Sequence, residues 1–571
     1  DEGWVTTIET AKLTVVDSEE LDFLGLSVAL SADGRTLVAG APGGSPSGVG
    51  VAYLYERPDE GWMTATEDAK LTASDAWDND NLGRSVALSA DGITVAAGAP
   101  YNDAGGDKRG AAYIYTRPSA GWPGSAVFSA KLTASDGQDK DFLGRSVALS
   151  SDGSTLAVGA PYHNLAGDNR GAVYVYERPP AGWTTATQSA KLTASDGEDN
   201  DFLGRSVALS ADGGTLAAGA PYHNAGGDNR GAVYVFVRPL DGWATDTEDA
   251  KLTAKGSVDG DALGISVALS GTGEVLAAGA PWYDAGGEDR GAAYIFLRPE
   301  NGWENTQQRA LLTASDGGND DRFGYAVSLN GGGYRLAVGA PDYPAGDLAR
   351  GAIYVFERPT DGWVFSNETA RLTASDGGDQ DKLGFPVAID SDGHTIIAGA
   401  YGNAAGGVGR GAVYLYARPE NGWADTTAFD TKLTASDGLE NDNLGYWVAI
   451  DAAGDTLVAG APNHDVVSDG SDRGAAYVFA RLTAPAFTSV APTGSLKVGE
   501  PFSFTFTASG FPIPSFSLSA GPLPPGLTLD ERSGLLSGIP SAAGRYTFTV
   551  SADNGVEPAA SQVVTLNVEA D

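Results

Sequence analysis

The sequence predicts an all-β protein: an eight-bladed β-propeller of four-stranded antiparallel blades, followed by a small β-sandwich. Three observations predict this fold. A unit of about 60 residues recurs eight times, each unit holds four short strand-forming runs, and the period stops near residue 484, where the composition changes. Self-similarity at such a period is typical of repeat architectures, and four strands per unit indicate a propeller. We find no convincing amphipathic helix.

Two short markers define the repeat and keep step with each other. The Gly-Trp dipeptide recurs at intervals of 58 to 61 residues, at Trp4, Trp62, Trp122, Trp183, Trp243, Trp303, Trp363 and Trp423. A Gly-Ala-Pro triplet begins at Gly40, Gly98, Gly159, Gly219, Gly279, Gly339 and Gly460, and Gly399 begins the one altered copy, Gly-Ala-Tyr.

The fourth unit shows the order of elements within a blade. Residues 190–194 alternate apolar and polar side chains, as a half-exposed strand does. Residues 203–209 form a second run, and the Asp212-Gly213 hairpin signal connects it to residues 215–220. After a glycine-rich loop, residues 231–236 are rich in strand-forming side chains. Each unit therefore supplies four antiparallel strands.

The two ends of the array favour a closed ring. A lone outer strand, around residues 10–15, opens the chain, and the last set of three inner strands ends at Phe479. The first strand can therefore complete the eighth blade, which would leave no open sheet edge. We expect a propeller over residues 1–483 and a second domain over residues 485–571.

Composition excludes several classes of protein. The 571 residues include 36 basic and 74 acidic side chains, a formal net charge of −38, and no cysteine. This charge argues against nucleic-acid binding by phosphate neutralisation. Without cysteine there is no disulfide scaffold, zinc ribbon or thiol chemistry, and no apolar run is long enough to span a membrane. The chain begins at Asp1 without a signal peptide, so we expect a mature or trimmed product.

The repeat resembles the FG-GAP repeat. A Leu-Gly or Phe-Gly step, as at Leu203-Gly204 and Phe323-Gly324, is followed by Gly-Ala-Pro in unit after unit. The FG-GAP repeat builds the integrin α-subunit propeller and many bacterial surface proteins. The resemblance implies extracellular adhesion through a protein or glycan ligand rather than catalysis. Integrin propellers have seven blades, so the eight units here depart from that pattern.

The C-terminal segment is similar to the immunoglobulin-like modules of bacterial surface proteins. Residues 503–507 and 546–550 alternate as sandwich strands do. The similarity rests on residues 523–529 and 533–538, and it implies an immunoglobulin-like β-sandwich that serves as a spacer or stalk.

An acidic loop precedes the Leu-Gly step in every unit, on what we call the upper face. Its carboxylates are spaced i, i+3, i+5, and such oxygens could supply part of a calcium shell. The candidate calcium ligands are Asp75, Asp78, Asp80, Asp136, Asp139, Asp141, Asp196, Asp199, Asp201, Asp376, Asp379 and Asp381. The alternative is that an Arg in the second upper loop, such as Arg109, pairs with this loop and fixes its shape. The integrin calcium motif lies in a hairpin that has too few carboxylates here, so that site is not carried over.

The position after the Leu-Gly step is expected at the mouth of the central channel. Its occupants are Leu26, Arg84, Arg145, Arg205, Ile265, Tyr325, Phe385 and Tyr446. Three successive units give Arg and three give aromatics, so the mouth could hold an acidic glycan or an acidic, aromatic peptide. Three tryptophans outside the Gly-Trp series, Trp77, Trp282 and Trp447, map to the same face. The alternative is that these Arg neutralise the acidic loops and the aromatics plug the channel.

Three functions remain open at this point. The first is a secreted or surface-exposed, non-enzymatic binding or adhesion protein whose upper face recognises an extracellular protein or glycan. The second is a structural subunit that joins copies of itself into a filament or surface layer, because the first strand could complete a neighbour's blade. The third, more remote, is an eight-bladed enzyme of the quinoprotein kind. Every carboxylate group recurs with the period, as scaffold residues do, so we expect no enzyme.

Overall fold

The structure is a computed structural model that describes residues 4, 8–17, 19–44, 48–59, 61–164, 167–284, 286–344, 348–364, 367–404, 406–465 and 472–570. These residues form β-strands and no α-helix, and none of them belongs to a helix suited to cross a membrane. The chain divides into two compact units. One comprises the described residues within 7–56 and 64–479, and the other comprises those within 1–6, 57–63 and 480–571.

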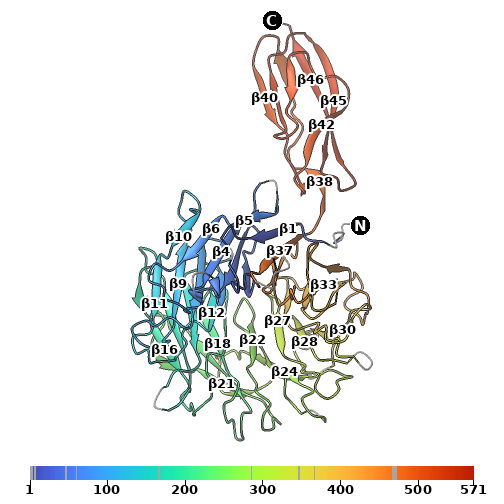
Figure 1. Cartoon of the computed structure of the whole chain (residues 1–571). Helices are drawn as coiled ribbons and strands as arrows, with labels where there is room; N and C mark the ends of the chain where they lie inside the picture. The colour runs from blue at the N-terminus through green and yellow to red at the C-terminus, as the bar shows by residue number, and fades with distance from the viewer. Residues whose placement is uncertain are drawn as a thin grey trace. The chain divides into compact units, whose positions relative to one another are not determined.

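The first unit is a ring of eight sheets, confirming the predicted eight-bladed propeller (Figure 1). In each blade three successive strands pair antiparallel, and an outer strand pairs antiparallel with the third. The innermost strands are β2 (Ser27–Leu30), β7 (Ser85–Leu88), β12 (Ser146–Leu149), β17 (Ser206–Leu209), β22 (Ser266–Leu269), β27 (Ala326–Leu329), β31 (Val387–Ile389) and β35 (Trp447–Ile450).

The middle of each blade is its most buried part. The second strands, which end in the Gly-Ala of the triplet, are β3 (Thr36–Ala41), β8 (Thr94–Ala99), β13 (Thr155–Ala160), β18 (Thr215–Ala220), β23 (Val275–Ala280), β28 (Arg335–Ala340), β32 (Thr395–Ala400) and β36 (Thr456–Ala461). The third strands are β4 (Val51–Glu56), β9 (Ala111–Thr116), β14 (Ala172–Glu177), β19 (Ala232–Val237), β24 (Ala292–Leu297), β29 (Ala352–Glu357), β33 (Ala412–Ala417) and β37 (Ala475–Ala480).

The outer strands belong in sequence to the unit that follows. They are β6 (Ala69–Thr72), β11 (Ala130–Thr133), β16 (Ala190–Thr193), β21 (Ala250–Thr253), β26 (Ala310–Leu312), β30 (Ala370–Leu372), β34 (Thr431–Leu433) and, for the last blade, β1 (Ala11–Thr14).

The strand that opens the chain closes the ring. In β1, Leu13 pairs antiparallel with Ala476 of β37, and the two strands are adjacent in Figure 1. The backbone bridge between Leu24 and Gly474 repeats, across the closure, the bridge that joins Gly110 to Leu143 elsewhere in the ring. The innermost strands β35 and β2 also contact each other, so the last blade packs against the first.

A short fifth strand, absent from the sequence prediction, links neighbouring blades. Asp246 and Thr247, just before the outer strand β21, pair parallel with β16 of the preceding blade. The segment before β1 does the same, because Ile8 bridges Thr434 beside β34. The fifth strands are β5 (Ala65–Thr66), β10 (Ser125–Val127), β15 (Ala186–Thr187), β20 (Asp246–Thr247) and β25 (Thr306–Gln307).

The two glycine motifs let adjacent blades approach closely. A Cβ at Gly98, in the Gly-Ala-Pro triplet, would collide with the backbone oxygen of Gly144, in the Leu-Gly step of the next blade. That same oxygen accepts a hydrogen bond from Ser85 Oγ at 2.9 Å. The triplet glycine is therefore required by blade packing, since any side chain there would push the sheets apart.

The core of the propeller lies between the faces of adjacent blades. One buried cluster joins Ala112 and Ile114 of one blade to Leu156, Val158 and Tyr174 of the next. Small alanines on one sheet oppose large side chains on the other, which fills the space between closely set sheets. The pattern recurs between other blade pairs.

On the lower face, four of the Gly-Trp tryptophans, Trp183, Trp243, Trp303 and Trp363, are hydrogen-bonded to the hairpin of their own blade. The indole Nε1 of Trp183 donates to Gly153 O at 3.1 Å, and that of Trp363 donates to Gly333 O at 3.0 Å. Trp183 is 7% exposed and Trp363 is fully buried. These two tryptophans have a packing role, because their polar atom and their ring are both engaged.

The C-terminal part of the second unit is a β-sandwich, as predicted. Its sheets are β39-β46-β45-β42, β40-β44-β43 and the pair β38-β41, around buried Phe506, Phe548 and Val564. The strands are β38 (Thr483–Phe487), β39 (Ser495–Lys497), β40 (Phe502–Thr505), β41 (Ala508–Phe511), β42 (Ser515–Ala520), β43 (Leu527–Leu529), β44 (Leu535–Gly538), β45 (Gly544–Asp553) and β46 (Ala560–Glu569).

Candidate functional site

A tight turn places each channel-mouth residue directly before its innermost strand. Gly144 adopts a φ of +97°, in the left-handed region that favours glycine. Its amide donates to Gly159 O at 3.1 Å, and the amide of Arg145 donates to Phe142 O at 3.1 Å. Arg145 therefore emerges from the turn one residue ahead of β12, and the repeat gives Arg84 and Arg205 the same place before β7 and β17.

The structure brings seven of the eight mouth residues together around the axis. Leu26, Arg84 and Tyr446 line one cavity. Arg84, Arg145 and Arg205 lie within each other's electrostatic field, and the charge of Arg205 also acts on Tyr325. Ring contacts connect Tyr325 to Phe385 and Phe385 to Tyr446. All the mouth positions around the axis are thus linked, except that of Ile265. These positions form what we call the channel mouth.

The cationic half of the mouth carries like charges at close quarters. Burial, together with the positive charges of Arg84 and Arg205, lowers the pKa of Arg145 to about 10. Burial is also the main cause that lowers the pKa of Arg84. All three arginines are half-buried residues. Among the described residues none of the three forms an ion pair with a carboxylate, so they do not neutralise the acidic loops there.

The aromatic half of the mouth is a compact cluster. The ring centroids of Tyr325 and Phe385 are 5.0 Å apart, and those of Phe385 and Tyr446 are 5.6 Å apart. Tyr401, which stands where the altered triplet has Tyr in place of Pro, packs against Phe385 at 4.9 Å and against Tyr446 at 5.7 Å. The cluster is half-buried, so it both fills part of the channel and presents ring surface to the mouth.

An arc of aromatic rings beside the arginines was missed by the sequence analysis. Tyr101, Phe142, Tyr162, Phe202 and Tyr222 contact one another edge to face, with centroid distances of 5.0 to 5.6 Å. Tyr101 and Tyr162 are each 36% exposed. The signal was present: the residue after the Gly-Ala-Pro triplet is Tyr in three successive units, the same three that place Arg at the mouth.

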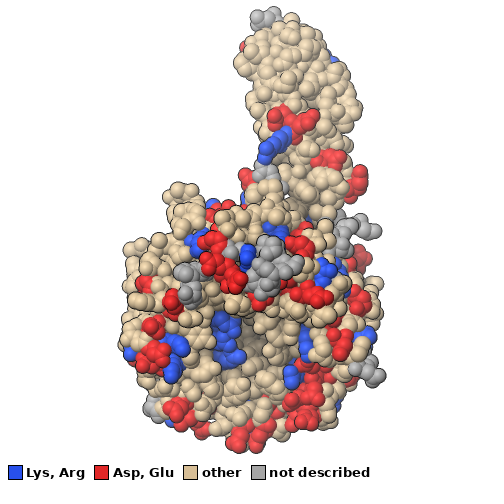
Figure 2. Space-filling view, in the orientation of Figure 1, with Lys and Arg blue, Asp and Glu red and all other residues tan. Residues whose placement is uncertain are grey.

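A cavity of about 450 Å³ lies where the cationic and aromatic halves meet. Arg84, Tyr101 and Tyr446 contribute to its lining, with Leu26 and Asn463 between them. Figure 2 shows a hollow near the middle of the propeller, with basic side chains gathered on one side of it, over β12 and β18. Cavities of this size are typical of small-ligand sites.

The three candidate tryptophans lie on the same face, in different settings. Trp77 is 71% exposed in an acidic loop, where its amide donates to Asp80 at 2.9 Å. Trp447 is 47% exposed and begins β35, directly after Tyr446. Trp282 is half-buried and follows the triplet of the fifth unit. None has a ring contact with the mouth aromatics among the residues that the structure describes.

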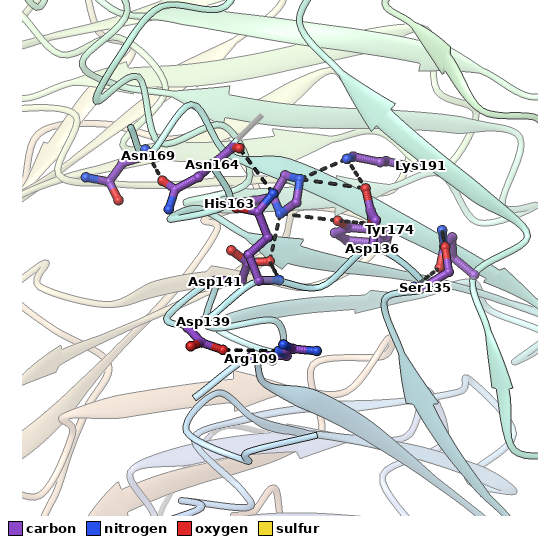
Figure 3. Close-up of polar contacts among 12 residues, drawn as sticks. Arg109, Ser135, Asp136, Asp139, Asp141, His163, Asn164, Asn169, Tyr174 and Lys191 are labelled. Carbon is purple, nitrogen blue, oxygen red and sulfur yellow. Dashed lines mark hydrogen bonds and ion pairs between the residues drawn. The ribbon is translucent and has the colours of Figure 1, made fainter. Parts of the chain in front are cut away.

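In the acidic loop of the third unit, Asp136 and Asp141 lie on either side of His163, and Asp139 has a different partner (Figure 3). Asp136 accepts hydrogen bonds from Tyr174 at 2.9 Å and from Lys191. Burial would raise the pKa of Asp136, but these two hydrogen bonds lower it below its ordinary value. Asp141 is buried and contacts His163 Nδ1 at 2.7 Å, while exposed Asp139 pairs with Arg109 of the second upper loop at 3.3 Å.

The same network recurs around the ring. The first carboxylate pairs with a Lys of the outer strand and with a Tyr of the third strand: Asp75 with Lys131 and Tyr113, Asp196 with Lys251 and Tyr234, Asp376 with Lys432 and Tyr414, and Asp437 with Lys12 and Tyr477. The third carboxylate contacts an Asn or a His: Asp80 with Asn102, Asp201 with His223, Asp381 with Asn403 and Asp442 with His464.

Ion pairing of these loops is thus observed directly. The middle carboxylate Asp199 pairs with Arg170 at 3.2 Å, and Asp379 accepts from the amide of Ala349 at 3.0 Å. Asp78 is exposed. Among the described residues no group of three or more His, Asp or Glu is placed to hold a metal ion. Calcium binding by the acidic loops stays a prediction, which calcium titration of the full chain can test.

The ring of eight blades with this upper face defines a repeat-built β-propeller protein. The chain belongs to the FG-GAP repeat family, whose sequence profile matches it eight times, over residues 7–55, 65–115, 127–176, 186–236, 247–296, 306–356, 366–416 and 428–479. Residues 484–569 match the profile described as "Putative Ig domain". The predicted family and domain type are thereby confirmed.

Other comparisons add little. No curated protein matches the chain. Among solved structures, the Dos1 propeller is similar with a TM-score of 0.47 and 11% identity, over 78% of this chain and 90% of that one. The WD40 repeats of RRP9 are similar with a TM-score of 0.40 and 12% identity, over 69% of this chain and 93% of that one. Similarities at this level carry no argument about function.

Proposed function

We propose that this chain is a non-enzymatic binding or adhesion protein that acts outside the cell and recognises a protein or glycan ligand at the channel mouth. FG-GAP propellers and immunoglobulin-like domains are typical of extracellular proteins, which supports the location. The observation that carries the ligand site is the departure from the repeat at the mouth. There, three successive blades present arginines that have no carboxylate partner among the described residues, and three others present aromatic rings.

The periodic polar networks support a binding role rather than catalysis. His163 contacts both Asp141 and Lys191, an arrangement with the parts of a proton relay. However, His163 is fully buried, and the same contacts recur at His223 and His464 in other blades. A group that fixes the acidic loop in blade after blade has the properties of a scaffold.

The test is binding of the full chain to an array of purified glycans and purified extracellular proteins. We expect at least one ligand whose binding falls about tenfold or more in Arg145→Gln and in Tyr325→Ala. The matched control is Arg109→Gln on the same face, whose side chain is engaged by Asp139. The proposal fails if nothing on the array binds, or if the mouth variants bind every ligand as the unmodified protein does.

A further inference from the structure

The three mouth arginines differ from the other arginines of the upper face. Arg109, Arg170 and Arg230 pair with Asp139, Asp199 and Asp259 at 3.0 to 3.3 Å. The guanidinium groups of Arg84, Arg145 and Arg205 have no hydrogen bond or ion pair to any residue that the structure describes, although acidic residues outnumber basic ones by 74 to 36. Of these three arginines, Arg84 lines the cavity of about 450 Å³, and Arg145 and Arg205 follow it at the equivalent positions of the next two blades.

Convergence of these groups favours one compact anion. Each guanidinium acts electrostatically on the others, so the free site holds like charges in a half-buried setting. Such an arrangement is unfavourable until an anion occupies it, because interactions between partly buried charges are screened less than those in water. A carboxylate offers two oxygens in one plane. A tetrahedral oxyanion ester offers three free oxygens, which suits guanidinium forks arriving from three adjacent blades.

The neighbouring rings favour a sugar as the carrier of that anion. Arg84 shares its cavity with Tyr101 and Tyr446, and the aromatic arc continues from Tyr101 along the arginine side of the mouth. The apolar C–H face of a pyranose can stack on such rings, while the tyrosine hydroxyl groups remain available for hydrogen bonds to the sugar. The volume of about 450 Å³ admits one or two sugar units.

The charge of the whole chain limits how many anions the ligand can carry. With a formal net charge of −38, the protein repels densely charged polymers over long range. The local attraction of three arginines operates only within the mouth. An isolated ester on an otherwise neutral sugar is repelled little at long range, because it carries a single anionic group. That group can still be attracted by the three arginines once it is in the mouth.

We propose that the channel mouth binds a sugar bearing a single sulfate or phosphate monoester. The ester lies among Arg84, Arg145 and Arg205, and the sugar ring lies against Tyr101 and Tyr446. This inference rests on the proposed function and names the class of ligand for the same site. Sulfate and phosphate share the chemistry that the arginines recognise, and the experiment separates them.

The experiment measures binding of four probes to the full chain by titration calorimetry or saturation-transfer NMR: galactose 6-sulfate, galactose 6-phosphate, galacturonic acid and galactose. We expect one or both esters to bind at least tenfold more tightly than galacturonic acid and galactose, and the stronger ester identifies the natural source. Inorganic sulfate or phosphate at constant ionic strength should displace the bound ester. Equal binding of galacturonic acid, or no binding of either ester, would overturn the inference.

The variants locate the site. Arg145→Gln and Arg205→Gln should each weaken ester binding about tenfold or more, whereas Arg109→Gln should stay within about twofold. Arg205→Lys, which keeps the charge, covers the case in which Arg205→Gln does not fold, and it should retain more binding than Arg145→Gln. Unchanged binding in folded Arg145→Gln refutes the inference. A different outcome would separate the two proposals: a protein or neutral glycan of the array binds, its binding is lost in Tyr325→Ala, and neither ester binds. The proposed function would then stand, and the ester inference would be wrong.

Discussion

At the scale of single residues, the third carboxylate of the acidic loop is buried in every unit, and its side-chain partner differs from unit to unit. Asp141 contacts His163, and Asp80 accepts from Asn102 at 2.5 Å. The equivalent Asp261 lies in the loop of the fifth unit, where Gly256 stands in place of the first carboxylate. Its Oδ2 accepts from the amide of Val258 at 2.7 Å, and its Oδ1, like that of Asp141, is buried without a hydrogen-bond partner in the part of the chain that the structure describes. Burial raises the pKa of Asp261 to about 7, and nearby Asp284 adds to the rise.

Asp261 therefore gives the folded protein a pH dependence of predictable sign. A carboxyl with a raised pKa stabilises the fold fully below its unfolded value of 3.8, and this contribution is lost as the pH rises through about 7. We expect Asp261→Asn, which can still accept from the amide of Val258, to be more stable than the unmodified protein at pH 8 by at least about 1 kcal/mol. Near pH 4 the difference should vanish. Urea unfolding at both pH values measures it.

The matched control is Asp259→Asn in the same loop. Asp259 is exposed and pairs with Arg230, so its loss should cost less than about 1 kcal/mol, with little change between pH 5 and 8. A gain in stability from Asp261→Asn that is the same at pH 4 and pH 8 would show that ionisation of Asp261 is not its cause.

The residue scale is also where sequence reasoning was least complete. Arg145 could be placed at the mouth because the Leu-Gly step fixes the start of an innermost strand. Tyr101 could not, since its approach to Phe142 depends on how the loop after the triplet turns toward the acidic loop of the next blade. The periodic pattern predicts which strand a residue follows, whereas the contacts of a loop side chain depend on two neighbouring blades at once.

At the scale of elements, the first strand has the contacts that a closing strand needs. Leu13 of β1 pairs with Ala476, and Lys12 contacts both Asp437 and His464, as Lys191 contacts Asp136 and His163 within the ring. Because every other blade takes its outer strand from the unit that follows, the last blade depends on the start of the chain. The structure thus gives β1 the same role as the seven other outer strands.

Removal of residues 1–15 should therefore destabilise the monomer. The edge of β37 would lose its partner, and Asp437 and His464 would lose Lys12. We expect a lower melting temperature by several degrees or loss of the folded propeller, partly restored by a peptide spanning residues 8–16. Circular dichroism and size-exclusion chromatography measure both effects. A truncated chain that folds as stably as before while the full chain forms polymers would favour strand exchange between copies and a structural-subunit function.

Elements were predictable where the sequence period carries their pattern. The four strands per blade follow from alternation and turn signals that recur eight times. The fifth strand, such as β20, has two residues and pairs parallel with a strand about 54 positions earlier, so it has no local signature. It forms because the chain must pass the edge of one blade to reach the next, and an edge with free backbone groups accepts pairing.

At the scale of the whole molecule, two electrostatic effects of opposite sign act on an anionic ligand. The net charge of −38 repels it at long range, and the three mouth arginines attract it within the mouth. Salt screens the long-range repulsion more than it screens the attraction between the arginines and the anion inside a half-buried site. The reason is that the Debye length falls to about 8 Å at physiological ionic strength. The two effects can therefore be separated by varying the salt concentration.

We predict that the affinity for a sugar monoester changes little, or rises, between about 20 and 150 mM NaCl. A basic protein that binds nucleic acid would instead lose about three to five orders of magnitude over a similar range. Calorimetry with galactose 6-sulfate or 6-phosphate at both salt concentrations measures the slope, and galactose gives the uncharged baseline. In Arg145→Gln the local attraction between the mouth and the ester is weaker, while the long-range repulsion from the net negative charge remains. The affinity of this variant for the ester should therefore be lower, and it should increase more with salt than the affinity of the unmodified protein. A tenfold or greater fall with salt in the unmodified protein would mean that long-range attraction dominates, which is incompatible with a local cationic mouth on an acidic propeller.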